Sequence, residues 1–197
     1  MRRVFAFLIA AGLIGGGLPA SRAAPEPATA QPGDAQPEQS RLDKLHAALK
    51  RERNERAAAR IADQIRQEWL QSGSATIDLL MQRAADAMQA KRFDAALDFL
   101  DEVTVLAPDF AEGWNRRATV HFMMNNHAKS MADIEHTLRL EPRHFGALSG
   151  MAAIFKLYGN KQAALNAFQR VLDVYPMLRS AQEELATLAD ELAGEGI

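Results

Sequence analysis

The chain has 197 residues, no cysteine and a formal net charge of −2 at pH 7. The lack of cysteine excludes disulfides, thiolate metal ligands and a lipid-attachment cysteine. Because the basic residues form no run and no aromatic-basic platform, the sequence argues against nucleic-acid binding and against tight binding to anionic lipid.

Residues 1–23 have the pattern of a secretory signal peptide. Arg2 and Arg3 precede an apolar run from Val4 to Leu18, and small residues follow up to Ala23. This run of 15 residues is short for a membrane span, which needs about 20. We predict cleavage after Ala23, no stable membrane insertion of the mature chain, and a bacterial periplasmic location. The alternative is a retained membrane anchor.

Residues 24–40 are rich in Pro, Ala and Gln, which predicts a flexible linker. The next segment, 41–71, carries two apolar stripes at helical spacing, with Asn54 as a plausible cap between them. The stripes are Leu42, Leu45, Ala48 and Leu49, then Ala58, Ile61, Ala62, Ile65 and Trp69. We expect residues 41–76 to form a degenerate helical pair that covers the end of a helical stack.

Three prolines, Pro108, Pro142 and Pro176, lie 34 residues apart and divide the chain into similar units. The units are residues 77–110, 111–144 and 145–178, and each predicts two helices with a proline just beyond the second. Asp109 and Glu112 have the spacing of a capping box that opens the second unit.

Small and large side chains recur at fixed positions of the three units. Small residues at the eighth and twentieth positions let two helices approach closely, and large residues fill the adjacent space. These residues are Ala84, Ala118 and Ala152; Ala96, Ser130 and Ala164; Leu80, Trp114 and Leu148; and Leu100, Ile134 and Phe168.

This pattern resembles that of the tetratricopeptide repeat (TPR) family. The resemblance implies an all-α fold, a right-handed superhelix of helical pairs spanning residues 41–197. It would begin with the degenerate pair and end with a capping helix over residues 179–193. The chain departs from the family pattern at two repeat positions. The usual aromatic residue is replaced by Ala87 and His121 in the first two units, and the usual leucine by Arg83, Arg117 and Met151 in the three units. These departures suggest looser packing in the first two units, but not a different fold.

The resemblance also implies a binding groove on the concave side, lined by the first helix of each unit. At the second position of each unit, Asp78, Glu112 and Gly146 argue against a clamp for a carboxylate ligand. The alternative is that the lining residues only complete the core. The hypothetical groove residues are Met81, Met88, Gln89, Asn115, Thr119, Phe122, Met123, Lys156 and Leu157.

No motif predicts catalysis, a metal site or a bound cofactor. The sequence has no HExxH, no GxSxG and no phosphate-binding GxxxxGK[ST] motif. Its five histidines are not spaced for joint ligation on one helix, so we expect them to be structural. The prediction is therefore a non-catalytic scaffold that holds a peptide or a partner protein. Two alternatives are a subunit that self-assembles through its end helices and an exported enzyme with an unrecognised site.

Overall fold

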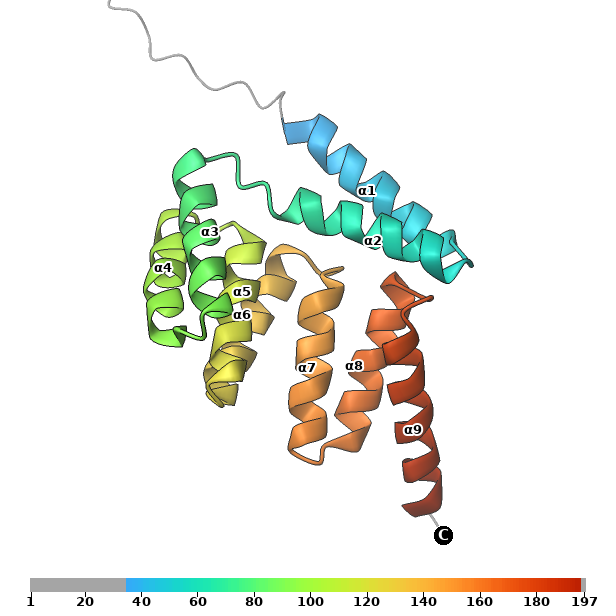
Figure 1. Cartoon of the computed structure of the whole chain (residues 1–197). Coiled ribbons are helices and arrows are strands. Elements are labelled where there is room, and N and C mark those ends of the chain that lie inside the picture. Colours follow the sequence, from blue (N-terminus) through green and yellow to red (C-terminus); the bar gives the residue numbers. More distant parts are fainter. Residues whose placement is uncertain (1–34, 196–197) are drawn as a thin grey trace, which may run out of the picture. The chain divides into compact units, whose positions relative to one another are not determined.

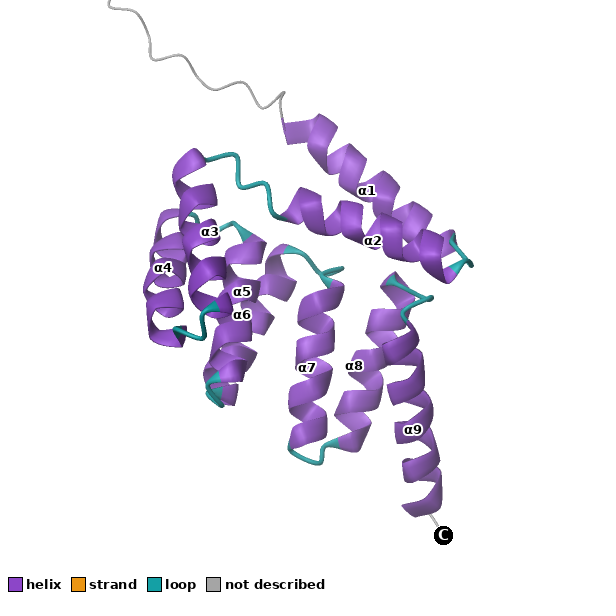
Figure 2. Cartoon of the chain, in the orientation of Figure 1, coloured by secondary structure: helices purple, strands orange, loops and turns teal. Residues whose placement is uncertain are grey.

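The computed structural model describes residues 35–195, and every regular element among them is an α-helix (Figures 1 and 2). The predicted all-α class is confirmed. The predicted signal peptide, with most of the predicted linker, lies outside the described residues. No helix within residues 35–195 has both the length and the apolar character that crossing a membrane requires. The helices are α1 (Ala35–Arg51), α2 (Glu55–Trp69), α3 (Ala75–Gln89), α4 (Phe93–Leu106), α5 (Ala111–Met123), α6 (His127–Leu140), α7 (Phe145–Leu157), α8 (Lys161–Val174) and α9 (Arg179–Glu195).

The first helix begins at Ala35, inside the segment that the sequence predicts as a linker up to residue 40. Pro37 is compatible with this start, because the first four backbone N–H groups of a helix have no partner within it. The predicted Asn54 cap is confirmed, since its side chain accepts a hydrogen bond from the Ala57 backbone N–H at 3.0 Å.

Helices α3 to α8 form three successive pairs, and α9 packs on α8 (Figure 1). The turn within each pair has the same geometry. Lys91, Asn125 and Gly159, each 34 residues apart, adopt positive φ angles of 55°, 60° and 71°. The next residue in each turn donates its backbone N–H to the carbonyl five residues back. This geometry ends the first helix of each pair and turns the chain into the second.

The outer face of the first pair is exposed at the positions where the other two pairs are buried, and the stack ends there. Val120 and Ile154 are buried in the second and third pairs, whereas the equivalent Asp86 is exposed. Gly113 is likewise buried, while the equivalent Leu79 is 53% exposed. A preceding repeat would need a flat apolar surface at these positions, so α3 and α4 form the terminal repeat.

The N-terminal pair α1–α2 packs on the third repeat, which corrects the prediction that it covers the end of the stack as a degenerate repeat. Leu49 of α1 and Ile65 of α2 share one apolar core with Phe145 and Tyr175. Phe145 and Tyr175 form an edge-to-face aromatic pair with ring centroids 5.6 Å apart. This aromatic platform gives the pair the apolar surface that the outer face of the first repeat does not offer.

Ion pairs of Arg117 connect the helices of the second repeat with one another and with the first repeat. Arg117 donates two hydrogen bonds to Asp133 of α6, at 2.7 and 2.8 Å, and another to Asp101 of α4 at 2.9 Å. The Trp114 ring lies 4.6 Å from the Arg117 guanidinium, and its indole N–H donates to the Pro108 carbonyl. A bidentate arginine thus joins two repeats at a position where leucine is usual.

Candidate functional site

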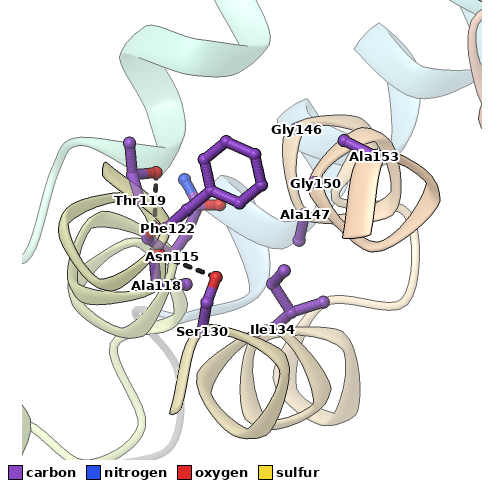
Figure 3. A pocket seen from close by; sticks show the side chains of 10 residues that line it. All are labelled: Asn115, Ala118, Thr119, Phe122, Ser130, Ile134, Gly146, Ala147, Gly150 and Ala153. Carbon is purple, nitrogen blue, oxygen red and sulfur yellow. Dashed lines mark hydrogen bonds between the residues drawn. The ribbon is translucent and has the colours of Figure 1, made fainter. Parts of the chain in front are cut away.

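A pocket of about 150 Å³ lies between α5 and α7 (Figure 3). Its rim on α5 is formed by Asn115, Thr119 and Phe122, while Ser130 and Ile134 of α6 lie at its floor. The α7 wall has only small residues: Gly146, Ala147, Gly150 and Ala153. We call this feature the α5–α7 pocket. It exists because the side chains of α7 are too short to fill the space opposite Phe122.

The α5–α7 pocket has no charged residue in its lining. Its polar groups are mostly engaged: the Ser130 hydroxyl donates to the Ala118 carbonyl at 2.8 Å, and the Thr119 hydroxyl to the Asn115 carbonyl at 2.9 Å (Figure 3). Phe122 is 37% exposed, so its ring offers apolar surface to the pocket. The pocket therefore suits an uncharged apolar group.

A second pocket, of about 250 Å³, lies on the other side of α5. We call it the α3–α5 pocket, and it contains one acidic and one basic residue, Asp78 and Arg116. The remaining lining residues are Leu70, Met81, Gln82 and Ala85. Leu70 belongs to the C-cap of α2, so the N-terminal pair forms part of this pocket's wall.

A buried carboxylate, Glu112, lies at the start of α5. Arg116 donates to one of its oxygens at 2.6 Å, and the Asn115 amide donates to the other at 2.9 Å. His144 Nδ1 accepts from the Ala147 backbone N–H, so Nε2 carries the proton that it donates to Glu112 at 3.1 Å. Burial alone would raise the pKa of Glu112, but the hydrogen bond from His144 and the charge of Arg116 hold this pKa below its ordinary value.

Glu112 therefore does not form the predicted capping box with Asp109. The N-cap of α5 is Phe110, which makes no side-chain cap hydrogen bond. The Glu112 side chain instead bonds to α5 itself and to the start of α7. The sequence spacing did not reveal this, because the partner His144 lies 32 residues away.

Residues 35–195 contain no group of three or more His, Asp or Glu side chains that could hold a metal ion. His46 and His144 are both buried against the Trp69 ring, whereas His121 is buried near Asp133 in the second repeat.

A curated relative decides the family. It is a TPR repeat-containing protein of Rhizobium etli, 60% identical over 156 residues, which are 79% of this chain and 76% of the relative. The chain belongs to the tetratricopeptide repeat family. A search of protein-family models found no matching model.

Three solved structures, two of them named as TPR domains, share the fold. The first TPR domain of Spaghetti (RPAP3), bound to the HSP90 peptide SRMEEVD, is 21% identical, with a TM-score of 0.58 over 61% of this chain and 95% of that domain. The Sgt2 TPR domain from Aspergillus fumigatus is 18% identical, with a TM-score of 0.57 over 62% of this chain and 83% of that domain. MamA is 13% identical, with a TM-score of 0.56 over 84% of this chain and 86% of its own.

The structure places the predicted TPR groove residues in three different surroundings. Asn115, Thr119 and Phe122 come together in the α5–α7 pocket. Met81 is 8% exposed and belongs to the core beneath the α3–α5 pocket, and Met88 packs partly against the same core. The TPR register thus brings the α5 residues together, while part of the α3 lining also completes the core.

The remaining predicted residues lie toward the C-terminal ends of the first helices. Gln89, Met123 and Leu157 are exposed at the ends of α3, α5 and α7. Lys156 forms an ion pair with Glu184 of α9, so its charge is already engaged. These four residues line neither pocket.

The repeat register of the family places Gly146 and Ala153 on the concave side, but it does not predict that they form the wall of a pocket together with Ala147 and Gly150. Gly146, Ser149, Gly150 and Ala153 are all small and recur at spacings of three and four, which is one face of a helix. That run of small residues was the available signal, because a helix face without large side chains leaves room for those of another molecule.

Proposed function

We propose that the protein is a non-catalytic TPR scaffold that holds a peptide or partner helix across α5. The observation that carries the proposal is the uncharged α5–α7 pocket, which faces Phe122 and is walled by small residues. An apolar cavity of about 150 Å³ has room for a benzene-sized group. We infer that the partner inserts one aliphatic or aromatic side chain there.

The ligand in this proposal is not a terminal carboxylate. Arg116 already bonds to Glu112, and Asp78 lies in the neighbouring pocket. An incoming carboxylate would meet these two acidic side chains, and like charges disfavour ionisation of both. The SRMEEVD peptide named for the Spaghetti structure therefore illustrates peptide binding by a related fold, while the chemistry proposed for this protein is apolar.

The proposed location is the periplasm of a bacterium. The support is the sequence of residues 1–23, a basic start, a short apolar run and a small-residue exit. N-terminal sequencing of the mature protein tests this. We expect Ala24 as the first residue, and a mature protein that begins at Met1 would contradict the proposal.

A pair of matched variants tests the pocket. Ala153→Glu introduces a charge into the uncharged pocket, whereas Ala186→Glu makes the same change on an exposed position of α9. We expect Ala153→Glu to abolish capture of binding partners from envelope extracts and Ala186→Glu to preserve it, with unchanged circular dichroism for both. Equal capture by both variants would show that the α5–α7 pocket is not the binding site.

A further inference from the structure

We propose that α1–α2 is a strap that docks on the third repeat, closes one end of the groove and undocks as a unit. The docked strap places Leu70 in the wall of the α3–α5 pocket. Undocking would withdraw Leu70 and widen that pocket. The regulatory role of the strap rests on the proposed function, because the α3–α5 pocket belongs to the proposed groove. The undocking of the strap does not depend on that function.

The latch of the strap is a stack of rings at the end of α2. The Trp69 indole lies parallel to the His144 ring, with centroids 4.0 Å apart and an interplanar angle of 12°. It also contacts Phe145 at 4.8 Å, and the Arg66 guanidinium lies 5.2 Å from that same phenyl ring. His144 in turn donates a hydrogen bond to Glu112, so the latch connects the strap through His144 to the start of α5.

The docked interface leaves buried polar atoms without partners. Within the described residues, four buried side-chain nitrogens lack a hydrogen bond, and three of them lie here: Trp69 Nε1 and both ring nitrogens of His46. The fourth is Nδ1 of His121, in the second repeat. The docked strap offers these three nitrogens no partner within the protein, whereas undocking exposes them to water.

A short hinge connects the strap to the repeats. Residues 70–74 separate α2 from α3, and Gly73 has a φ of +73°, which glycine adopts without strain. An added Cβ at Gly73 would meet no atom within 4 Å, so the backbone there is unobstructed. The apolar core of the strap is formed with the third repeat and not with α3. The strap can therefore separate without unfolding the repeats.

The surroundings of His46 make docking sensitive to acid. His46 faces Asp43 of its own helix and Glu141, Arg143 and His144 of the segment before α7. The adjoining cavity also contains Lys50 of α1 and Asp173 of α8. Burial, followed by the charge of Arg143, lowers the pKa of His46 from 6.5 to about 4.

The sign of the effect follows from that lowered pKa. Between pH 6.5 and about 4, His46 is protonated when the strap is undocked but neutral when it is docked. Docking therefore weakens as pH falls. Above this window docking has its full strength, and below it no further loss occurs. At pH 5 the docking equilibrium constant should be about thirtyfold smaller than at pH 8.

Hydrogen exchange on the purified protein, with no partner added, tests the strap. We expect amides of α1 and α2 to exchange at least tenfold faster than those of α7 and α8, after correction for intrinsic rates, because they open without global unfolding. Their protection should fall about thirtyfold from pH 8 to pH 5, while protection of α7 and α8 is retained.

The variant His46→Leu removes the titrating group and both unpartnered nitrogens. We expect it to raise the protection of α1–α2 and to abolish the fall at pH 5. The control His127→Gln, at the first residue of α6, should keep the fall. Equal exchange of α1–α2 and α7–α8 at every pH would overturn the strap. A fall that persists in His46→Leu would overturn its control by His46. If the groove proved to bind no partner, both hydrogen-exchange results would stand unchanged.

Discussion

Gly113→Ala adds a methyl group where α5 crosses α4, and it tests how closely the first two repeats must approach. A Cβ at this position would lie 2.6 Å from Cγ1 of Val103 and 3.4 Å from Cδ1 of Phe110. Val103 is fully buried in the core of the first repeat. A β-branched residue within a helix has one strongly preferred rotamer, so Val103 cannot turn aside at low cost.

Two opposing contributions set the magnitude. Alanine is better than glycine inside a helix by about 1 kcal/mol. Overpacking of a close-packed core costs about 1–3 kcal/mol, and the 2.6 Å contact places this site toward the upper end. We therefore expect Gly113→Ala to lower the free energy of unfolding by about 1–2 kcal/mol.

A double-mutant cycle with Val103→Ala isolates the contact. Removing the Val103 methyl groups should make Gly113→Ala stabilising by about 1 kcal/mol, a coupling of about 2–3 kcal/mol between the two sites. Urea unfolding followed by far-UV circular dichroism measures all four proteins. The control is Gly194→Ala near the end of α9, where an added Cβ meets nothing within 4 Å. Stability equal to that of the unmodified protein, with no coupling to Val103→Ala, would refute the close approach of α4 and α5.

Three further changes have expected outcomes in the same unfolding assay. Lys91→Gly should stabilise the protein by about 1 kcal/mol, because Lys91 has a φ of 55° in the turn after α3; no gain would contradict that conformation. Asp133→Asn should lower the free energy of unfolding by about 1–3 kcal/mol, because it weakens the bidentate bond to Arg117. An unchanged free energy of unfolding would show that this ion pair does not stabilise the fold. Glu112→Gln should lower the free energy of unfolding at pH 7 and make it fall less steeply with pH below 4.5. The pKa of Glu112 in the folded protein is lower than its ordinary value of 4.5, so the ionised carboxylate stabilises the fold above pH 4.5. This stabilisation is lost as pH falls through the lowered pKa. An unchanged slope below pH 4.5 would contradict this role.

The repeat architecture could be predicted because it depends on local spacing. Small residues such as Ala84, Ala118 and Ala152 recur every 34 residues, and all three are buried. Trp114 shows where this reasoning ends. Its repeat position predicts a core side chain, yet the indole is only half-buried and stacks on His136, with ring centroids 3.8 Å apart. The register gives the face of a helix, but the depth of burial depends on neighbours from other helices.

The position of α1–α2 could not be predicted from its own sequence, because two amphipathic helices can cover any apolar surface of suitable size. The information lay in the third repeat. Its first position is Phe145 where the second repeat has Ala111, and Tyr175 stands where the first repeat has Ala107. The other equivalents are Ile77 and Glu141, so among the three repeats the third alone has two aromatic residues at this edge, and these mark a docking surface. The α5–α7 pocket likewise depends on the small α7 residues, whose effect appears only when α5 and α6 are placed beside them.

The two ends of the stack argue for the groove as the binding surface. A second copy stacked on the first repeat would bury Gln82 and Asp86, which hydrogen-bond to each other on the exposed face of α3. Stacking on the other end would cover Glu183 and Asp190, which are exposed on α9. Burying such groups without new partners is costly, so both ends disfavour self-assembly by stacking. The uncharged α5–α7 pocket carries no such cost, and moving a partner's apolar side chain from water into it lowers the free energy of the complex.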